Sequence, residues 1–247
     1  LAVPFFILAG ELMNQGGITA AIVRFAQTLV GHVRGGLAQV NVLSSMMFAG
    51  ISGSAVADAS AIGKMLIPEM EKQGYSRPFA SAVTAAAAVV GPIIPPSGIM
   101  VLYGFVMNVS IGALFAGGVV PGILIGLGLM GVIRSLAGRY RLPPAAPRAG
   151  WAERGRAFKG AWLALLLPVI LLGGMLSGVF TATEAAAVAV AYALFVTVFV
   201  LRNTGWRDLQ RIFRATALQS GVILLLVGAA VTLGWLVTVS GLATRIA

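Results

Sequence analysis

Residues 78–133 read PFASAVTAAAAVVGPIIPPSGIMVLYGFVMNVSIGALFAGGVVPGILIGLGLMGVI and carry no charged side chain over 56 positions. About 20 apolar residues suffice for one helix across a bilayer, so this stretch alone can cross twice. The rest of the chain agrees, because 59% of its 247 residues are apolar, only 10% are charged, and the mean hydropathy is +0.97. Soluble domains carry roughly 25% charged residues. The composition therefore predicts an all-α polytopic membrane protein and excludes soluble nucleic-acid-binding modules and most soluble enzymes.

The basic residues predict how the chain crosses the membrane, because Lys and Arg collect in short cytoplasmic loops. Of the 17 basic residues, 16 fall into three groups that can all face the cytoplasm, and only Arg245 falls outside them. The predicted order is a first crossing with an interfacial amphipathic arm (1–34), a re-entrant helical hairpin (35–66), a broken transmembrane helix (67–110), a transmembrane helix (111–133), a basic cytoplasmic linker (134–159), two transmembrane helices (160–201), a basic cytoplasmic segment (202–214) and the start of a second repeat (215–247).

The hairpin is predicted because residues 35–66 start and end near basic residues assigned to the same side. The segment between them is apolar or small, yet it is too short for two full crossings at 1.5 Å per residue. Its middle, GISGS at 50–54, is flexible and rich in hydroxyl groups. Non-helical backbone persists at membrane depth only where it is buried in protein or lines a watery cavity. The alternative is a pair of short amphipathic helices on the membrane surface.

Residues 91–98, GPIIPPSG, place three prolines within five positions of a predicted crossing. Proline lacks an N–H, and its ring clashes with the carbonyl four residues earlier. The carbonyls of Ala88, Gly91 and Pro92 therefore lose their helical donors. We expect two half-helices, whose freed carbonyls can bind a hard cation and whose N-termini attract an anion, as in secondary transporters. The alternative is a packing kink, for which one proline would be enough.

Oxygen-bearing side chains coincide with both interruptions. Ser52 and Ser54 lie at the hairpin tip, and Ser97 lies in the break. Asp58 follows the tip closely, and ionisable residues within membrane segments are functional candidates. Alternatively, Asp58 could simply form an ion pair with Lys64. The sequence leaves open whether Asp58 has a functional role or a structural one in such a pair.

Other residues receive structural interpretations. Glu184 follows Thr181 near a predicted helix start, where a carboxylate stabilises the helix N-terminus. Gly118, Gly122 and Gly126 form two overlapping GxxxG steps, which predict close contact with another helix. These residues carry no chemistry in the prediction.

An enzyme is not predicted, because no catalytic set is present in the sequence. The chain has no cysteine and no HExxH pattern, and its one histidine, His32, lies at a predicted interface. Asp58 is then the only acid at membrane depth, whereas an aspartyl dyad needs two. Glu11 and Asn14, near the inner end of the first crossing, receive no assignment.

An internal repeat is indicated by residues 10–23 and 234–247, which share four identities in 14 positions. The predicted path runs through these two segments in opposite directions. Inverted-topology repeats of this kind build many secondary carriers. Because the chain starts without Met and ends just after an apolar run, we expect an internal fragment in which the second repeat is truncated.

A family resemblance is carried by three segments: GISGSAVADASAIGKMLIPEMEKQGY at 50–75, GPIIPPSGIMVLYG at 91–104 and GVFTATEAAAVAVAYALFV at 178–196. They resemble the large membrane (permease) subunit, DctM-like, of tripartite ATP-independent periplasmic (TRAP) transporters. The resemblance implies an elevator-type, sodium-driven uptake of an organic acid, such as a four-carbon dicarboxylate or sialic acid, across the bacterial inner membrane. It also implies a small TRAP membrane subunit and a periplasmic solute-binding receptor as partners, and no cofactor beyond the coupling sodium ion.

The resemblance also implies the site residues. The sodium site would use Ser52, Gly53 and Ser54 of the tip with Gly91, Pro95 and Ser97 of the break. The candidates for the substrate site are Ser54, Asp58, Pro96 and Ser97. Two alternatives remain: a receptor-independent sodium-coupled anion carrier of a related inverted-repeat family, and a non-catalytic membrane scaffold.

Overall fold

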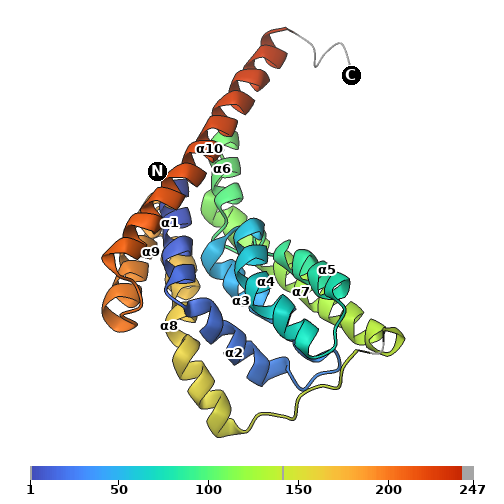
Figure 1. The fold of residues 1–247 in the computed structure, drawn as a ribbon. Coiled ribbons are helices and arrows are strands. Elements are labelled where there is room, and N and C mark those ends of the chain that lie inside the picture. The colour runs from blue at the N-terminus through green and yellow to red at the C-terminus, as the bar shows by residue number, and fades with distance from the viewer. Residues whose placement is uncertain (1, 141, 241–247) are drawn as a thin grey trace.

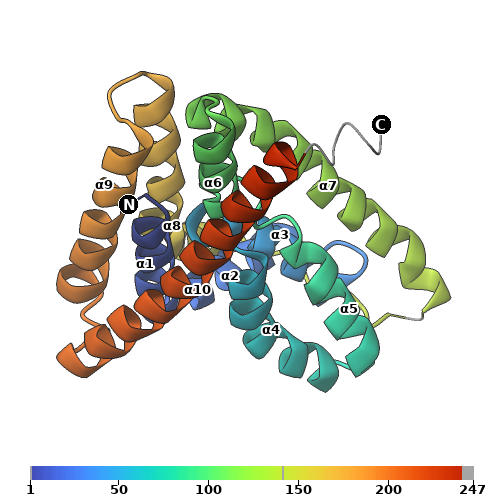
Figure 2. The same ribbon diagram turned by 90° about the horizontal axis from the view of Figure 1, so that it is seen from above.

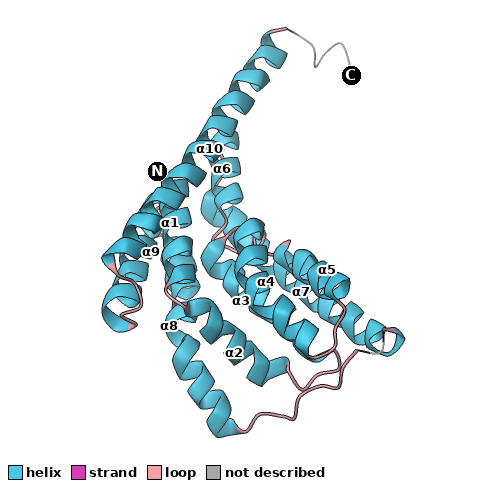
Figure 3. Cartoon of the chain, in the orientation of Figure 1, coloured by secondary structure: helices cyan, strands magenta, loops and turns pink. Residues whose placement is uncertain are grey.

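The computed structural model describes residues 2–140 and 142–240, and the regular structure of this part of the chain is entirely helical (Figure 3). The elements are α1 (Ala2–Gln15), α2 (Ile18–Val30), α3 (Gly36–Ser52), α4 (Ala55–Lys72), α5 (Arg77–Ala88), α6 (Gly98–Met107), α7 (Ile111–Arg139), α8 (Trp151–Leu176), α9 (Ala182–Leu194), a π-helical extension of α9 (Phe195–Val200) and α10 (Trp206–Val239).

Several of these helices are long and apolar enough to cross a membrane. Four pass by length and composition: α7, α8, α9 with its π-helical extension, and α10. A fifth span is possible if α1 and α2, which meet at a bend of 70°, are counted together. The all-α polytopic fold predicted from the composition is therefore confirmed.

Helix α3 occupies the centre of the molecule. It packs against α1, α2, α4, α5, α7 and α8, and it lies between a group formed by α1, α8 and α9 and a group formed by α4, α5 and α7 (Figures 1 and 2). Of its 17 residues, 13 are buried, as expected of a helix that is covered on every side. Helix α3 is therefore an interior helix of the described chain and not a surface helix with one polar face.

The predicted hairpin is present as α3 and α4. The two helices pack against each other, and the turn between them consists of Gly53 and Ser54. At the other end, the Tyr75 hydroxyl donates a hydrogen bond of 2.8 Å to the Gly35 carbonyl. The base of the hairpin is thereby closed by a contact between the residues that precede α3 and follow α4.

The predicted break is also present, since α5 ends at Ala88 and α6 begins at Gly98. The GxxxG glycines of α7 contact this region as expected for close packing. A Cβ atom on Gly118 or Gly122 would contact Ile93 or Ile94 of the break, and one on Gly126 would contact Met46 of α3. The small residues of α7 therefore let it lie directly against the break and the hairpin.

The predicted basic linker, residues 134–159, is too long. Helix α7 continues to Arg139 and α8 already begins at Trp151, so only the proline-rich part between them lacks helix. The error arises because clustered charges mark where a segment leaves the membrane, and Arg, Lys and Glu are good helix formers that let a helix continue into water.

Two other predicted boundaries are wrong for the same reason. Helix α4 continues past residue 66 to Lys72, and its exposed end carries an ion pair of 3.7 Å between Lys72 and Glu69. Helix α10 begins at Trp206, so the predicted segments 202–214 and 215–247 share one helix. The second copy of the proposed repeat, residues 234–247, lies partly outside the described residues.

The assignment of Glu184 to a helix cap is confirmed. The Thr181 N–H donates a hydrogen bond of 2.8 Å to the Glu184 carboxylate. In return, the Glu184 N–H donates one of 3.3 Å to the Thr181 hydroxyl. This reciprocal pair is a capping box at the start of α9.

Candidate ion and substrate site

The hairpin tip and the proline break lie in direct contact. A Cβ atom on Gly53 would contact the Pro96 carbonyl oxygen and lie 3.1 Å from the Ser97 Cα atom. A Cβ atom on Gly91 would lie 2.6 Å from Asp58 Oδ2 and 3.0 Å from the Ser54 carbonyl carbon. The structure therefore brings the tip residues 52–54 against the break residues 91–97, although they are about 40 positions apart in the chain.

Glycine is required at position 53 for two independent reasons. Its φ of 59° lies in the left-handed region, which is strained for residues with a side chain. This conformation ends α3, and the Gly53 N–H donates a hydrogen bond of 3.0 Å to the Ala49 carbonyl. A side chain would also enter the space that the backbone of the break occupies.

Two of the three candidate serines are helix caps. The Ser54 hydroxyl accepts a hydrogen bond of 3.4 Å from the Ala57 N–H at the start of α4. The Ser97 hydroxyl accepts one of 3.3 Å from the Met100 N–H at the start of α6. Two helix N-termini, each with a partial positive charge, therefore begin in the two segments that touch. Such N-termini favour an anion.

Asp58 is fully buried and faces the break. The Ser52 hydroxyl donates a hydrogen bond to Asp58 Oδ1, whereas Asp58 Oδ2 is buried without a hydrogen-bond partner. Among the described residues, Asp58 forms no ion pair with Lys64 or any other cation. The alternative explanation of its charge by pairing with Lys64 is therefore not supported by the structure.

One of the three carbonyls predicted to be free is in fact bonded. The Ala88 carbonyl accepts a hydrogen bond of 3.0 Å from the Gly91 N–H. The chain tightens into a turn after α5, so a donor three residues later replaces the missing donor four residues later. In the described chain, no hydrogen bond reaches the carbonyls of Gly91 and Pro92, in agreement with the prediction for these two.

A cavity of about 310 Å³ opens beside the tip and the break and is lined by residues of α1, the tip and the break, including Ser52, Gly53, Ser54, Pro92 and Gly98. A larger cavity of about 800 Å³ adjoins it, and Ser54 lines both. Of the other substrate-site candidates, Asp58, Pro96 and Ser97 are buried and line neither of these two cavities.

Several polar residues around these cavities were not predicted from the sequence. Glu11 and Gln219 line both cavities, and Lys64 and Arg211 line the larger one. For Glu11 a signal was available, because a carboxylate within a crossing helix is costly and rarely accidental. For Arg211 and Gln219 there was none, since only the packing of α10 against α1 brings them to the cavity.

The site has no ligand set for a transition metal. Within residues 2–140 and 142–240, no group of three or more His, Asp and Glu side chains gathers at one point. The polar atoms available are oxygens of a carboxylate, of hydroxyls and of the backbone. Such oxygens suit alkali or alkaline-earth ions.

The model of the family "Tripartite ATP-independent periplasmic transporter, DctM component" matches residues 1–247. The chain belongs to this family. A DctM-family relative, the sialic acid TRAP transporter large permease protein SiaM of Vibrio cholerae, is 44% identical over 96% of the chain and 55% of its own length. The C4-dicarboxylate TRAP transporter large permease protein DctM of the same species is 49% identical over 83% of the chain and 45% of its own length.

A third relative is the 2,3-diketo-L-gulonate TRAP transporter large permease protein YiaN of Escherichia coli, 41% identical over 98% of the chain and 57% of its own length. The chain thus spans about half the length of the curated relatives it matches. These names are those of transporter subunits, in agreement with the prediction that the chain is not an enzyme. Family membership and the apolar helices place the chain in the bacterial inner membrane as a multi-pass protein.

Proposed function

We propose that the chain belongs to the permease subunit of a sodium-coupled TRAP system that takes up a small organic acid. The observation that carries this proposal is the contact between the tip and the break, with the unpartnered Asp58 Oδ2 beside it. Interrupted helices that meet in this way form the ion and substrate sites of many secondary transporters.

The sodium ion is proposed to bind among Ser52, Gly53, Ser54, Gly91, Pro95 and Ser97. Asp58 Oδ2 and the bare carbonyls of Gly91 and Pro92 support a cation at this point. A buried carboxylate oxygen without a partner is unfavourable, and a bound cation would satisfy it. The Ser52 hydroxyl donates to Asp58 and accepts a hydrogen bond of 3.3 Å from the Ser54 N–H, so one lone pair of its oxygen stays available to the same ion.

The substrate is proposed to bind through its carboxylate at the N-termini of α4 and α6. Ser54 caps α4 and lines the cavity, so it is placed for direct contact. Asp58 would repel a carboxylate, and a sodium ion near Asp58 would remove this repulsion. We infer that this electrostatic dependence couples the binding of sodium and substrate. Pro96 and Ser97 do not line the cavity, and we infer that they support the site by their contact with the tip.

The relatives support the substrate class and the partners. Their names give sialic acid, C4-dicarboxylate and 2,3-diketo-L-gulonate, all of which are organic acids. The family is tripartite, so we propose a small membrane subunit and a periplasmic solute-binding receptor as partners. We further propose that the hairpin and the broken helix move as one transport domain of an elevator built from inverted repeats.

The decisive experiment substitutes Ser52→Ala and Ser97→Ala in the subunit as its gene encodes it, reconstituted with its small subunit and its receptor in vesicles. Each variant is expected to need about tenfold more sodium for half-maximal uptake, since one hydrogen-bonding group at a charged ligand contributes roughly this factor. Ser110→Ala is the matched control for Ser97→Ala, because Ser110 also caps a helix, α7, but is exposed and outside the site.

Unchanged sodium dependence in both site variants would disprove the sodium assignment. Equal loss in Ser97→Ala and Ser110→Ala would point to helix capping as the cause of the Ser97 effect. Uptake that continues without the receptor would favour the receptor-independent carrier. A scaffold would show neither uptake nor any effect of sodium on thermal stability.

A further inference from the structure

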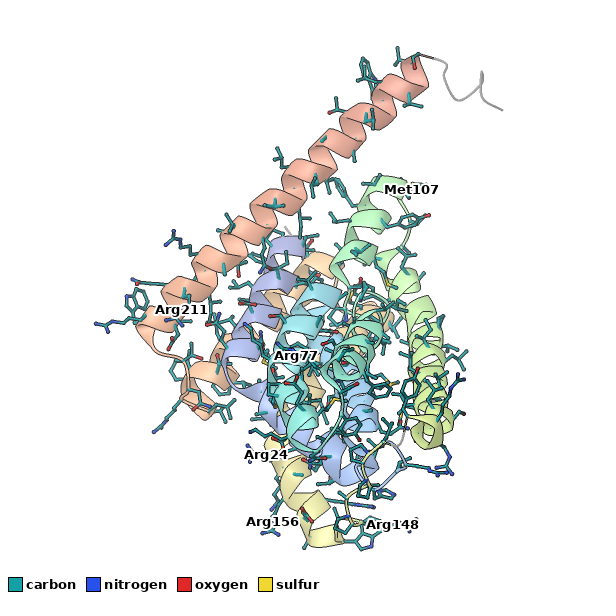
Figure 4. All side chains as sticks on the ribbon, turned by 45° about the vertical axis from the view of Figure 1, so that its right-hand side comes forward. Arg24, Arg77, Met107, Arg148, Arg156 and Arg211 are labelled. Carbon is teal, nitrogen blue, oxygen red and sulfur yellow. The ribbon has the colours of Figure 1, made fainter. Side chains whose placement is uncertain are left out.

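A third cavity, of about 420 Å³, lies between α2 and the connection from α7 to α8. Its lining includes Arg24 and Thr28 of α2, Arg148 of the connection, and Glu153 and Arg156 of α8. Figure 4 shows Arg24, Arg148 and Arg156 at one end of the molecule, far from Met107 at the end of α6. This cavity takes no part in the proposed transport site.

The walls of this cavity are held by contacts between distant parts of the chain. The rings of Phe25 and Phe158 pack with their centroids 5.5 Å apart, which joins α2 to α8. The Ala146 N–H donates a hydrogen bond of 3.1 Å to the Gly31 carbonyl, which joins the connection to the end of α2. The three arginines are therefore brought together by the fold, since Arg24 lies more than 120 positions before Arg148.

The cavity carries an excess of positive charge. Three guanidinium groups line it, and Glu153 is the only carboxylate that the described residues contribute to its lining, so the surplus among these residues is two positive charges at neutral pH. Within the described parts of the chain, Arg24, Arg148 and Arg156 form no ion pair. Guanidinium groups bind phosphate oxygens through paired hydrogen bonds, so the chemistry of the cavity fits a phosphate.

Exposed aromatic side chains place this cavity at the boundary between water and lipid. On α8, the exposed fractions are 86% for Trp151, 50% for Phe158 and 46% for Trp162. Tryptophan collects at the level of lipid headgroups, and α8 continues from here into an apolar span. A phosphate bound by the arginines would therefore lie at the depth of a phospholipid headgroup.

We propose that Arg24, Arg148 and Arg156 form a binding site for the phosphate group of an anionic phospholipid, in the leaflet that the basic loops face. The lipid bridges α2, the connection and the start of α8. Its acyl chains lie along the apolar surface of α8. The site therefore ties the interfacial arm to a crossing helix through a lipid.

The test uses the subunit as its gene encodes it, purified in a neutral detergent, with binding of phosphatidylglycerol measured by native mass spectrometry and by thermal shift. Phosphatidylcholine and inorganic phosphate are the comparison ligands. We expect that, of these three ligands, only phosphatidylglycerol raises the melting temperature of the subunit. Replacing all three arginines by Gln should weaken its binding about 100-fold, because one basic residue near an anionic lipid surface contributes about fivefold.

The matched control replaces Arg134, Arg139 and Arg207 by Gln, which removes the same charge from exposed positions outside the cavity. Control and site variants that lose binding equally would overturn the proposal in favour of diffuse charge attraction. Inorganic phosphate that binds as well as the lipid would overturn the lipid assignment. Should the triple variant not fold, Arg156→Gln alone must lower the number of bound lipids, and an unchanged number would refute the site.

Discussion

Helices α3 and α10 are both apolar, yet they occupy opposite environments. Helix α3 is short and buried, and it carries small and polar residues such as Gln39, Asn41 and Ser44 in its covered surface. Helix α10 is long, projects beyond the other helices (Figure 1) and exposes large apolar side chains such as Leu225 and Leu233. Polar side chains are therefore buried in α3 beside apolar ones such as Phe48, whereas many of the side chains that α10 exposes are large and apolar.

Large exposed apolar surfaces are rare on soluble proteins, and the lipid surroundings of a membrane helix explain them. Lipid is as apolar as leucine, so large apolar side chains gain nothing by leaving it. Small residues let helix backbones approach, and polar side chains find hydrogen-bond partners only between helices. Hydropathy thus identifies membrane helices, whereas small and polar residues show which of them build the interior and the site at its tip.

The largest effect is expected for Gly53→Ala at the end of α3. The new side chain would be strained at a φ of 59° and would meet the backbone of the break. We expect a loss of about 2 kcal/mol or more in the free energy of unfolding, and a clear loss of uptake, because the new side chain would push the break away from the tip. Gly228→Ala in α10, where a Cβ meets nothing within 4 Å, is the control and should retain full uptake. Comparable activity of the two variants would contradict the contact between tip and break.

An intermediate effect is expected for the polar pair that joins α3 to α5. The Asn41 side-chain amide donates a hydrogen bond of 2.7 Å to the Thr84 hydroxyl, and both residues are buried. Asn41→Ala leaves the Thr84 hydroxyl with only its hydrogen bond to the Ala80 carbonyl, and Thr84→Val leaves the Asn41 amide with only the Met70 sulfur. Each should lower the unfolding temperature, at a cost of about 1–3 kcal/mol. The double variant should cost less than the sum of the two single variants. Additive losses would show that the pair does not interact.

The smallest effect is expected for Leu225→Ala on α10, where the side chain is 74% exposed. Because most of this side chain is exposed, the substitution removes little packing within the described chain. The free energy of unfolding should therefore change by less than about 0.5 kcal/mol. Thermal unfolding in detergent measures this directly. A loss of 2 kcal/mol or more would show that this face of α10 packs against protein, and the contrast with α3 would then disappear.

The break and the hairpin were predictable because proline and glycine act locally. Three prolines end a helix wherever it lies, and Gly53 ends α3 through its own backbone conformation. The helix ends at Lys72, Arg139 and Trp206 were not predictable in the same way. Clustered charged residues indicate where the chain leaves the membrane, but a helix can continue past that point into water.

The composition and the order of residues by themselves determined the membrane class and the two places where helices must stop. These properties follow from the solvation of side chains and from local backbone sterics, which need no tertiary contact. Only the tertiary structure decided that the two interruptions touch, and that one oxygen of Asp58 is buried without a partner. Those outcomes depend on distances between residues far apart in the chain, which local sequence does not encode.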